Sequence, residues 1–289
     1  MDILNLGVSI LFDGFAYAMV LYVIAVGLSV TMGLLGIANL AHGVFAMAGG
    51  YVTLTLMNDA GAPFWGALVV SFVAVALLSV VLERLLYRHL YGAGELEQTL
   101  LSIGLIFVAT AVAHAVFGPL PQRVEIPPAI GGHFAVLGRT FPTYRAFLIV
   151  AGFVLFAGLW LGLDRTTIGA RIRAAVDNRS MAQCIGIDTD LLFTLVFALG
   201  SGVAALGGSL GADIVAISPG YAMEQLVYFL IVVAVGGLGT IRGPFAAALL
   251  LGLGDTACKI LVPQFGAFFI YAAVLVVLLL KPAGLFGRA

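Results

Sequence analysis

Charged residues are scarce in this sequence: Asp, Glu, Lys and Arg make up 9% of the 289 residues, whereas apolar residues make up 62%. Ordinary soluble domains carry roughly 25% charged residues, so this composition excludes a typical soluble protein and indicates a chain embedded in a membrane. The 13 basic and 14 acidic residues give a net charge of -1, which leaves no basic excess for nucleic acid. We therefore expect membrane lipid, and no nucleic acid, around the chain.

Lysine is especially rare: the chain has two lysines, Lys259 and Lys281. A phosphate-binding P-loop requires Gly-Lys-Ser/Thr, but these lysines follow Cys258 and Leu280. Any step driven by ATP must then come from another chain. The zinc motif His-Glu-x-x-His is also absent, so we predict no enzyme activity and no catalytic, cofactor-binding or metal-binding residues in this chain.

Cysteine is nearly absent as well, with Cys184 and Cys258 far apart in the sequence. Their positions predict locations near opposite membrane faces, which excludes a disulfide between them. The pair therefore says little about the redox compartment.

Long uncharged segments dominate what remains. The segment from Asp13 to Asp59 has no charged residue and is about twice the ~20 residues that one helical span requires, so it must fold back once. Transmembrane strands would alternate polar and apolar residues, which 67–82 and 272–280 do not. We predict an all-α, polytopic membrane protein with about eight to ten helices, nine being the best count and some of them interrupted, and residues 1–289 forming one domain.

Basic residues predict the orientation of these helices. Four arginines lie in 164–190, and Arg84 and Arg88 lie two predicted spans earlier. Because basic loops face the cytoplasm, both segments are expected there. With nine spans, the N-terminus lies outside and the C-terminus inside.

The predicted cytoplasmic loop, 164–190, contains a candidate helix. Thr166 and Thr167 suit a helix start, 170–185 lacks glycine and proline, and Gly186 suits a helix end. This helix either rests on lipid headgroups, through an apolar side made of Ile168, Ile172 and Val176, or contacts a cytoplasmic partner. Asp177 and Asn178 among its arginines favour the partner, because a headgroup-binding face would be more uniformly basic.

Glycine is abundant, at 37 residues. The pair Gly207 and Gly211 has the small-xxx-small spacing of closely packed membrane helices, although such clusters also occur in helices that are broken or that slide. The segment 33–43 contains Asn39 and His42 among glycines without any charge. It predicts an interrupted helix whose polar groups face a water-filled cavity, with an ordinary turn capped by Asn39 as the alternative.

The outer connection, 118–144, is rich in proline and predicts a rigid, irregular segment. A docking surface and a simple tether are equally compatible with it.

Two other kinds of transporter are alternatives to a permease that works with an ATPase. An ion-coupled carrier usually has acidic residues deep in the membrane, but Asp13, Asp213, Glu224 and Asp255 map near the outer ends of predicted spans, and of these Asp255 alone fits inside a span. A channel for a small neutral solute fits the low charge, yet it leaves the polar cytoplasmic helix without a role.

Four motifs in matching order extend over nearly the whole chain, and through them it resembles the permease subunits of branched-chain amino-acid ABC importers, which are related to ribose-type sugar permeases. These motifs occupy residues 33–43, 170–187, 236–244 and 281–287. One departure is Arg242 before Gly243 and Pro244, where related permeases often have a neutral residue or proline.

The resemblance implies a bacterial inner-membrane subunit that imports branched-chain or similar amino acids, or related small amides and organic acids. It implies a periplasmic substrate-binding protein, a second and related permease subunit, and two ATPase subunits that hold ATP and Mg²⁺. It also implies a translocation pathway near Asn39, His42 and Gly43. The coupling helix that contacts the ATPase would include Arg171, Arg173, Asp177, Asn178, Met181, Ile185 and Gly186.

Overall fold

The computed structural model describes residues 3–36, 39–128, 130–136 and 139–287. Helices make up most of it, as the sequence predicts. The elements are α1 (Ile3–Leu35), α2 (His42–Asn58), α3 (Phe64–Leu85), the 3-10 helix η1 (Tyr87–Leu90), α4 (Glu95–Phe117), β1 (His133–Val136), β2 (Arg139–Pro142), α5 (Thr143–Asp164), α6 (Thr167–Asp177), α7 (Arg179–Cys184), α8 (Thr189–Gly211), α9 (Tyr221–Gly236), α10 (Arg242–Leu261), the 3-10 helix η2 (Pro263–Phe268) and α11 (Phe269–Leu280).

Six helices are long and apolar enough to cross a membrane: α1, α3, α4, α5, α8 and α10. The set includes α10, which carries the charged residues Asp255 and Lys259. Within the described ranges, α9 and α11 are shorter apolar helices, and α2 has 17 residues. The predicted count of nine is reached when these three shorter helices are included.

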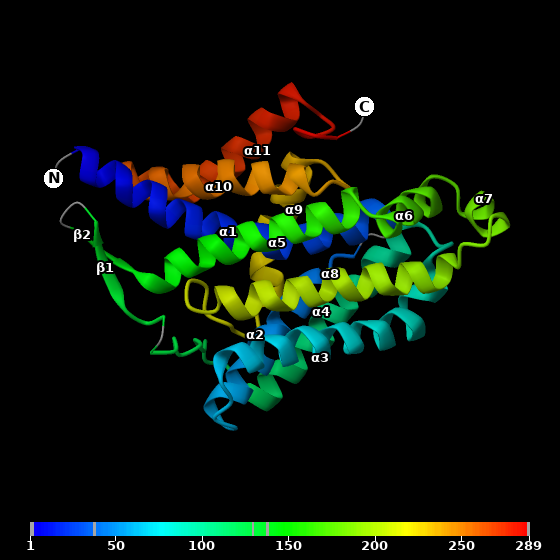
Figure 1. Cartoon of the computed structure of the whole chain (residues 1–289), viewed down its shortest axis with the longest axis horizontal. Helices are drawn as coiled ribbons and strands as arrows, with labels where there is room; N and C mark the ends of the chain where they lie inside the picture. Colours follow the sequence, from blue (N-terminus) through cyan, green and yellow to red (C-terminus); the bar gives the residue numbers. More distant parts are fainter. Residues whose placement is uncertain (1–2, 37–38, 129, 137–138, 288–289) are drawn as a thin grey trace.

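Helix α1 forms the centre of the bundle and packs against α5, α8, α9 and α10. Its most apolar stretch is 83% buried, compared with 17% for α4 and for α5, which present most of their surface outward. The N-terminus and the two strands lie at one end of the bundle, which we call the hairpin end; α6 and α7 lie at the other, the α6–α7 end (Figure 1).

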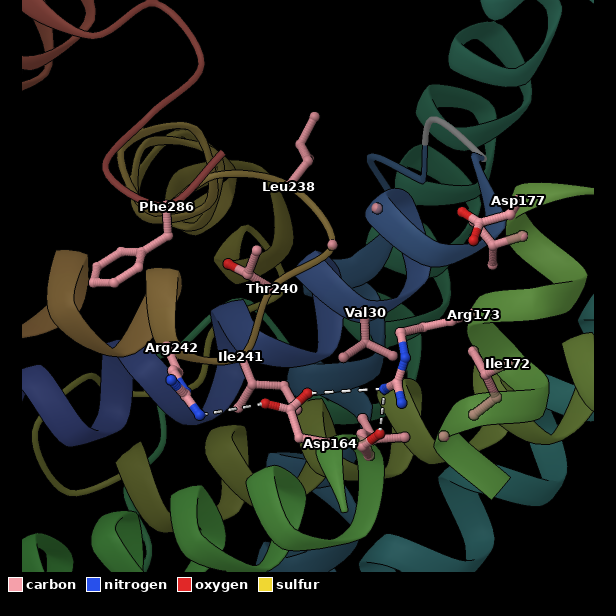
Figure 2. Close-up of a pocket in the computed structure, with 15 residues that line it drawn as sticks. Val30, Asp164, Ile172, Arg173, Asp177, Leu238, Thr240, Ile241, Arg242 and Phe286 are labelled. Carbon is pink, nitrogen blue, oxygen red and sulfur yellow. Dashed lines mark hydrogen bonds and ion pairs between the residues drawn. The ribbon is translucent and has the colours of Figure 1, made fainter. Parts of the chain in front are cut away.

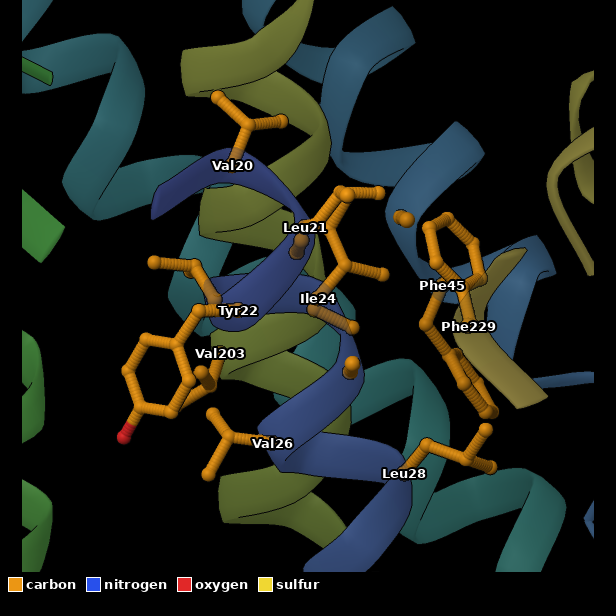
Figure 3. Packing of buried hydrophobic residues seen from close by; sticks show 14 of the residues in the cluster. Val20, Leu21, Tyr22, Ile24, Val26, Leu28, Phe45, Val203 and Phe229 are labelled. Carbon is orange, nitrogen blue, oxygen red and sulfur yellow. The ribbon is translucent and has the colours of Figure 1, made fainter. Parts of the chain in front are cut away.

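Close packing of α1, α2 and α8 builds the core (Figure 3). Val20, Leu21 and Ile24 of α1 are buried, as are Phe45 of α2 and Val203 of α8. Glycines bring the backbones together: a Cβ at Gly207 would overlap Ile24, and a Cβ at Gly208 would overlap the backbone of Ala46. The packing role predicted for this glycine cluster is therefore confirmed.

Ser209 lies within the same cluster. The spacing Gly-x-Ser-x-Gly over 207–211 is also that of a hydrolase nucleophile, which requires a strand-to-helix turn. Here Ser209 lies inside α8, where its hydroxyl donates to the Gly49 carbonyl at 2.9 Å and accepts from Thr53 at 2.8 Å. Ser71 of α3 lies 3.0 Å from it. Ser209 therefore joins three helices and has no nucleophilic setting.

The outer connection is more regular than its prolines predict. Strands β1 and β2 pair as an antiparallel hairpin, from His133 opposite Pro142 to Val136 opposite Arg139. Gln122 pairs with Ile217 in an isolated bridge, with N-to-O distances of 2.8 Å in both directions. No helix forms among the described residues between α4 and α5, as expected, but the connection is not irregular throughout, because backbone groups here find partners within the connection and after α8.

Candidate translocation and coupling sites

The chain breaks between α1 and α2, where the sequence predicts an interrupted helix. Helix α1 ends at Leu35, followed by Gly36 with φ of 65°; Ile37 and Ala38 lie outside the described residues. Helix α2 begins at His42, whose Nε2 lies 3.0 Å from the carbonyl oxygen of Ile24. Because Ile24 is well inside α1, α2 starts within the bundle, and the predicted interruption is confirmed.

The polar residues of this break are enclosed. Asn39 and His42 are both 0% exposed, and the Tyr87 hydroxyl donates to Asn39 Oδ1 at 2.8 Å. Neither residue lines either of the two cavities described below, and the expected water-filled cavity around them stays a prediction. Asn39 Nδ2 and His42 Nδ1 have no hydrogen-bond partner within the described ranges, which is unusual for buried polar atoms.

Gly43 lies where two helices meet. A Cβ there would lie 2.8 Å from the carbonyl oxygen of Ala222 in α9. Gly43 therefore permits the close approach of α2 to α9, and its role in a translocation pathway stays a prediction.

The predicted coupling helix is two helices. Helix α6 ends at Asp177, and α7 starts at Arg179. Between them Asn178 is extended, with φ of -153° and ψ of 97°, and its Oδ1 accepts from the Met181 N–H at 2.9 Å. The prediction of one continuous helix was wrong because the Asn178 side chain caps a new helix in place of continuing the old one.

The predicted ends of this segment are confirmed. Thr166 caps α6 by accepting from the Gly169 N–H at 3.3 Å, and Gly186 has φ of 85° after α7. The expected apolar side is present, because Ile168, Ile172 and Val176 recur every four residues along α6; Ile172 is buried, whereas Ile168 is 59% exposed.

Helix α6 is joined to the bundle by Arg173. Its guanidinium donates to the carbonyl oxygen of Leu163, near the end of α5, at 2.7 Å. Asp164 lies between two arginines, 4.0 Å from Arg173 and 3.9 Å from Arg242, as Figure 2 shows. These groups border a cavity of about 580 Å³ at the α6–α7 end.

Arg242 is the first residue of α10. Its guanidinium lies 5.0 Å from the centre of the Trp160 ring in α5. Together with its contact to Asp164, this places Arg242 as a link between α10 and α5.

Helix α7 is joined to the bundle by Asp190, at the start of α8. Arg179 and Arg88 each lie 2.6 Å from a different oxygen of this carboxylate. Arg179 also lies 5.3 Å from the centre of the Phe193 ring. Sequence reasoning missed Arg88 and Asp190 because they are 102 residues apart.

The seven residues predicted to contact an ATPase lie at the surface of the α6–α7 end, all of them exposed. Met181 is 62% exposed and Ile185 69%. Arg171 and Asp177 form no ion pair with any described residue, whereas Arg173 is already bonded within the chain. This end therefore presents unpaired charge and exposed apolar side chains side by side.

Metal and thiol chemistry have little basis in the described residues. No group of three His, Cys, Asp or Glu residues there is arranged to hold a metal ion. Cys184 and Cys258 are free thiols.

Known proteins resemble this chain over nearly its full length. The family profile described as "Branched-chain amino acid transport system / permease component" matches residues 10–279. The permease protein BraD of a high-affinity branched-chain amino acid transport system in Pseudomonas aeruginosa is 26% identical, covering 92% of this chain and 91% of the relative.

Two further relatives are named LivH. The Escherichia coli permease protein LivH, of a high-affinity branched-chain amino acid transport system, is 25% identical over 96% of this chain and 94% of its own. A probable branched-chain amino acid transport permease protein LivH of Methanocaldococcus jannaschii is 28% identical, over 98% of this chain and 94% of the relative. These matches favour a permease subunit over an ion-coupled carrier or a channel. The chain belongs to the family of permease components of branched-chain amino-acid transport systems.

Proposed function

We propose that this chain is the permease subunit of an ATP-driven importer for branched-chain amino acids, or for similar amino acids, small amides or organic acids. The α6–α7 end would face the cytoplasm, and the hairpin end, with the N-terminus, would face outward. The observation that carries the proposal is the exposed surface of α6 and α7 on an otherwise apolar bundle. Family membership supports the transported class.

The proposed partners follow from the two ends. Two ATPase subunits, which bind ATP and Mg²⁺, contact α6 and α7; a substrate-binding protein docks at the hairpin end; and a second, related permease completes the membrane unit. Arg171 and Asp177, which have no ion pair among the described residues, supply charge for an ATPase surface, and Met181 and Ile185 supply apolar contact. In such a contact the charged residues provide specificity for the partner, and the apolar residues provide the area that is buried.

The contacts of α6 and α7 provide a route for motion in this proposal. ATP binding closes the ATPase pair, which displaces α6 and α7. Arg173 transmits the displacement to α5, and the Arg179–Asp190 pair transmits it to α8. The ATPases can shift the bundle between outward-open and inward-open states by as much as their contacts differ between the two states.

Co-purification and uptake test this function. Asp177→Arg and Met181→Glu should each lower the amount of ATPase that purifies with the permease, and lower leucine uptake into proteoliposomes containing the complete transporter. Glu125→Arg and Leu120→Glu are matched controls for ATPase recovery alone, because both residues are exposed at the hairpin end, away from α6 and α7. Full ATPase recovery and uptake with both α6–α7 variants would contradict the coupling surface; wild-type complex that imports no branched-chain amino acid would contradict the substrate class.

A further inference from the structure

A second cavity, of about 420 Å³, lies toward the hairpin end, away from α6 and α7. Its walls come from α1, α5, α9, α10 and residues 214 and 215 after α8. Its volume falls within the roughly 300 to 1,000 Å³ of small-molecule sites. The cavity is thus large enough for a small ligand, and five separate parts of the chain form it.

Charge is concentrated in this cavity. Asp13, Arg145, Asp255 and Lys259 all line it, which places four of the chain's 27 charged residues at one site. Asp13 pairs with Arg145 across α1 and α5, and Asp255 pairs with Lys259 at 2.6 Å. Two acids and two bases leave the site neutral overall, yet rich in both signs of charge.

Asp255 is the most enclosed of the four. Its side chain is 3% exposed, whereas that of Lys259 is 55% exposed. The Lys259 ammonium also lies 5.7 Å from the centre of the Tyr17 ring, and Tyr17 lines the same cavity. Burying a carboxylate away from water costs free energy unless it is paired. The burial of the Asp255 carboxylate in a cavity wall, next to Lys259, therefore indicates that its charge has a function.

Each charged group retains capacity for a ligand. The ion pair uses one guanidinium nitrogen of Arg145, and a guanidinium has five N–H donors. The Lys259 ammonium has three donors, of which one is directed at Asp255 Oδ2. Asp255 Oδ1 accepts no hydrogen bond from the described chain. Donors for a carboxylate and acceptors for an ammonium are therefore available in one cavity.

We propose that this cavity binds the substrate as a zwitterionic α-amino acid on its way through the permease. Arg145 and Lys259 receive the carboxylate, Asp13 and Asp255 receive the ammonium, and apolar residues such as Ile214 contact the aliphatic side chain. The inference rests on the proposed function and narrows it, because uncharged amides lack both charges and simple organic acids lack the ammonium.

Direct binding tests the site without the substrate-binding protein. Radiolabelled L-leucine is dialysed against the purified complex of both permeases and both ATPases. We expect saturable binding by the wild type, with leucinamide and 4-methylpentanoate competing at least ten-fold more weakly than leucine, because each lacks one charge. Asp255→Asn and Arg145→Gln should weaken leucine binding at least ten-fold, whereas Glu125→Gln, at an exposed position outside the cavity, should not.

A charge exchange separates binding from a purely structural ion pair. The double variant Asp13→Arg/Arg145→Asp keeps one charge of each sign between α1 and α5 but reverses their places. A structural pair predicts restored leucine binding, which would overturn the proposal, whereas a substrate site predicts that binding stays weak while thermal stability recovers.

Uptake distinguishes failure of the site from failure of the proposed function. The proposed binding site would be contradicted if the wild-type complex binds no leucine, or if the cavity variants bind and import leucine normally. In either case, leucine import by the wild type would still support the proposed function. Leucine binding that depends on these charges, without any import by the complete transporter, would instead overturn the function.

Discussion

Arg179 donates to Asp190 at 2.6 Å, across the turn that joins α7 to α8. Since Arg88 donates to the other oxygen of Asp190, this carboxylate joins α7, α8 and η1. The three side chains are between 40% and 53% exposed, and exposed ion pairs contribute only about 0.2 to 1 kcal/mol each. Their importance is therefore mechanical, because they join the proposed ATPase contact to a core helix.

Asp190→Asn should reduce the leucine imported per ATP hydrolysed, because α7 would move without displacing α8. We expect a change in melting temperature of no more than a few degrees, because the lost pairs are exposed. Uptake and phosphate release are measured on the same proteoliposomes. Arg88→Gln is the matched control, since it removes the η1 contact and keeps Arg179 on Asp190. An unchanged import ratio for Asp190→Asn would contradict this coupling route.

Asn178 offers a test of the break between α6 and α7. Asn178→Ala removes the acceptor for the Met181 N–H, and loss of such a cap costs about 1 kcal/mol. We expect faster amide hydrogen exchange over residues 179–184 and less ATPase bound to the permease. Asn178→Asp retains a capping oxygen and should behave like the wild type. Equal exchange in both variants would show that the cap does not hold α7.

The sequence predicted the two ends of the α6–α7 segment but not its division. Thr166 and Gly186 act through local backbone geometry, which a sequence pattern shows directly. Asn178 is compatible both with a helix interior and with a cap, and tertiary contacts decide between them. Asp190 was missed for a different reason: its partner Arg88 comes from a distant segment. Helical spans were predictable because lipid requires long apolar segments, whereas long-range ion pairs leave no periodic pattern.

The glycine cluster of α8 provides a stability prediction. Gly208→Ala would place its Cβ against the backbone of Ala46, so α2 and α8 must separate. Overpacking of this kind costs about 1 to 3 kcal/mol, and we expect a clear fall in melting temperature in detergent. Gly104 of α4 and Gly158 of α5 are matched controls, because a Cβ at either position meets nothing within 4 Å. Their alanine variants should be neutral or slightly more stable.

Asn39 and His42 test whether the buried break belongs to the translocation pathway. Asn39→Leu and His42→Leu should reduce leucine uptake while the complex still assembles, because both remove polar atoms from the interrupted helix. Asn39→Leu also removes the acceptor of the buried Tyr87 hydroxyl, a loss of about 0.5 to 1.5 kcal/mol. Tyr87→Phe breaks the same hydrogen bond but leaves Asn39 in place, so it measures the structural part alone. If Tyr87→Phe lowers uptake as much as Asn39→Leu does, and His42→Leu lowers it not at all, the break serves packing, and the pathway lies elsewhere in the bundle.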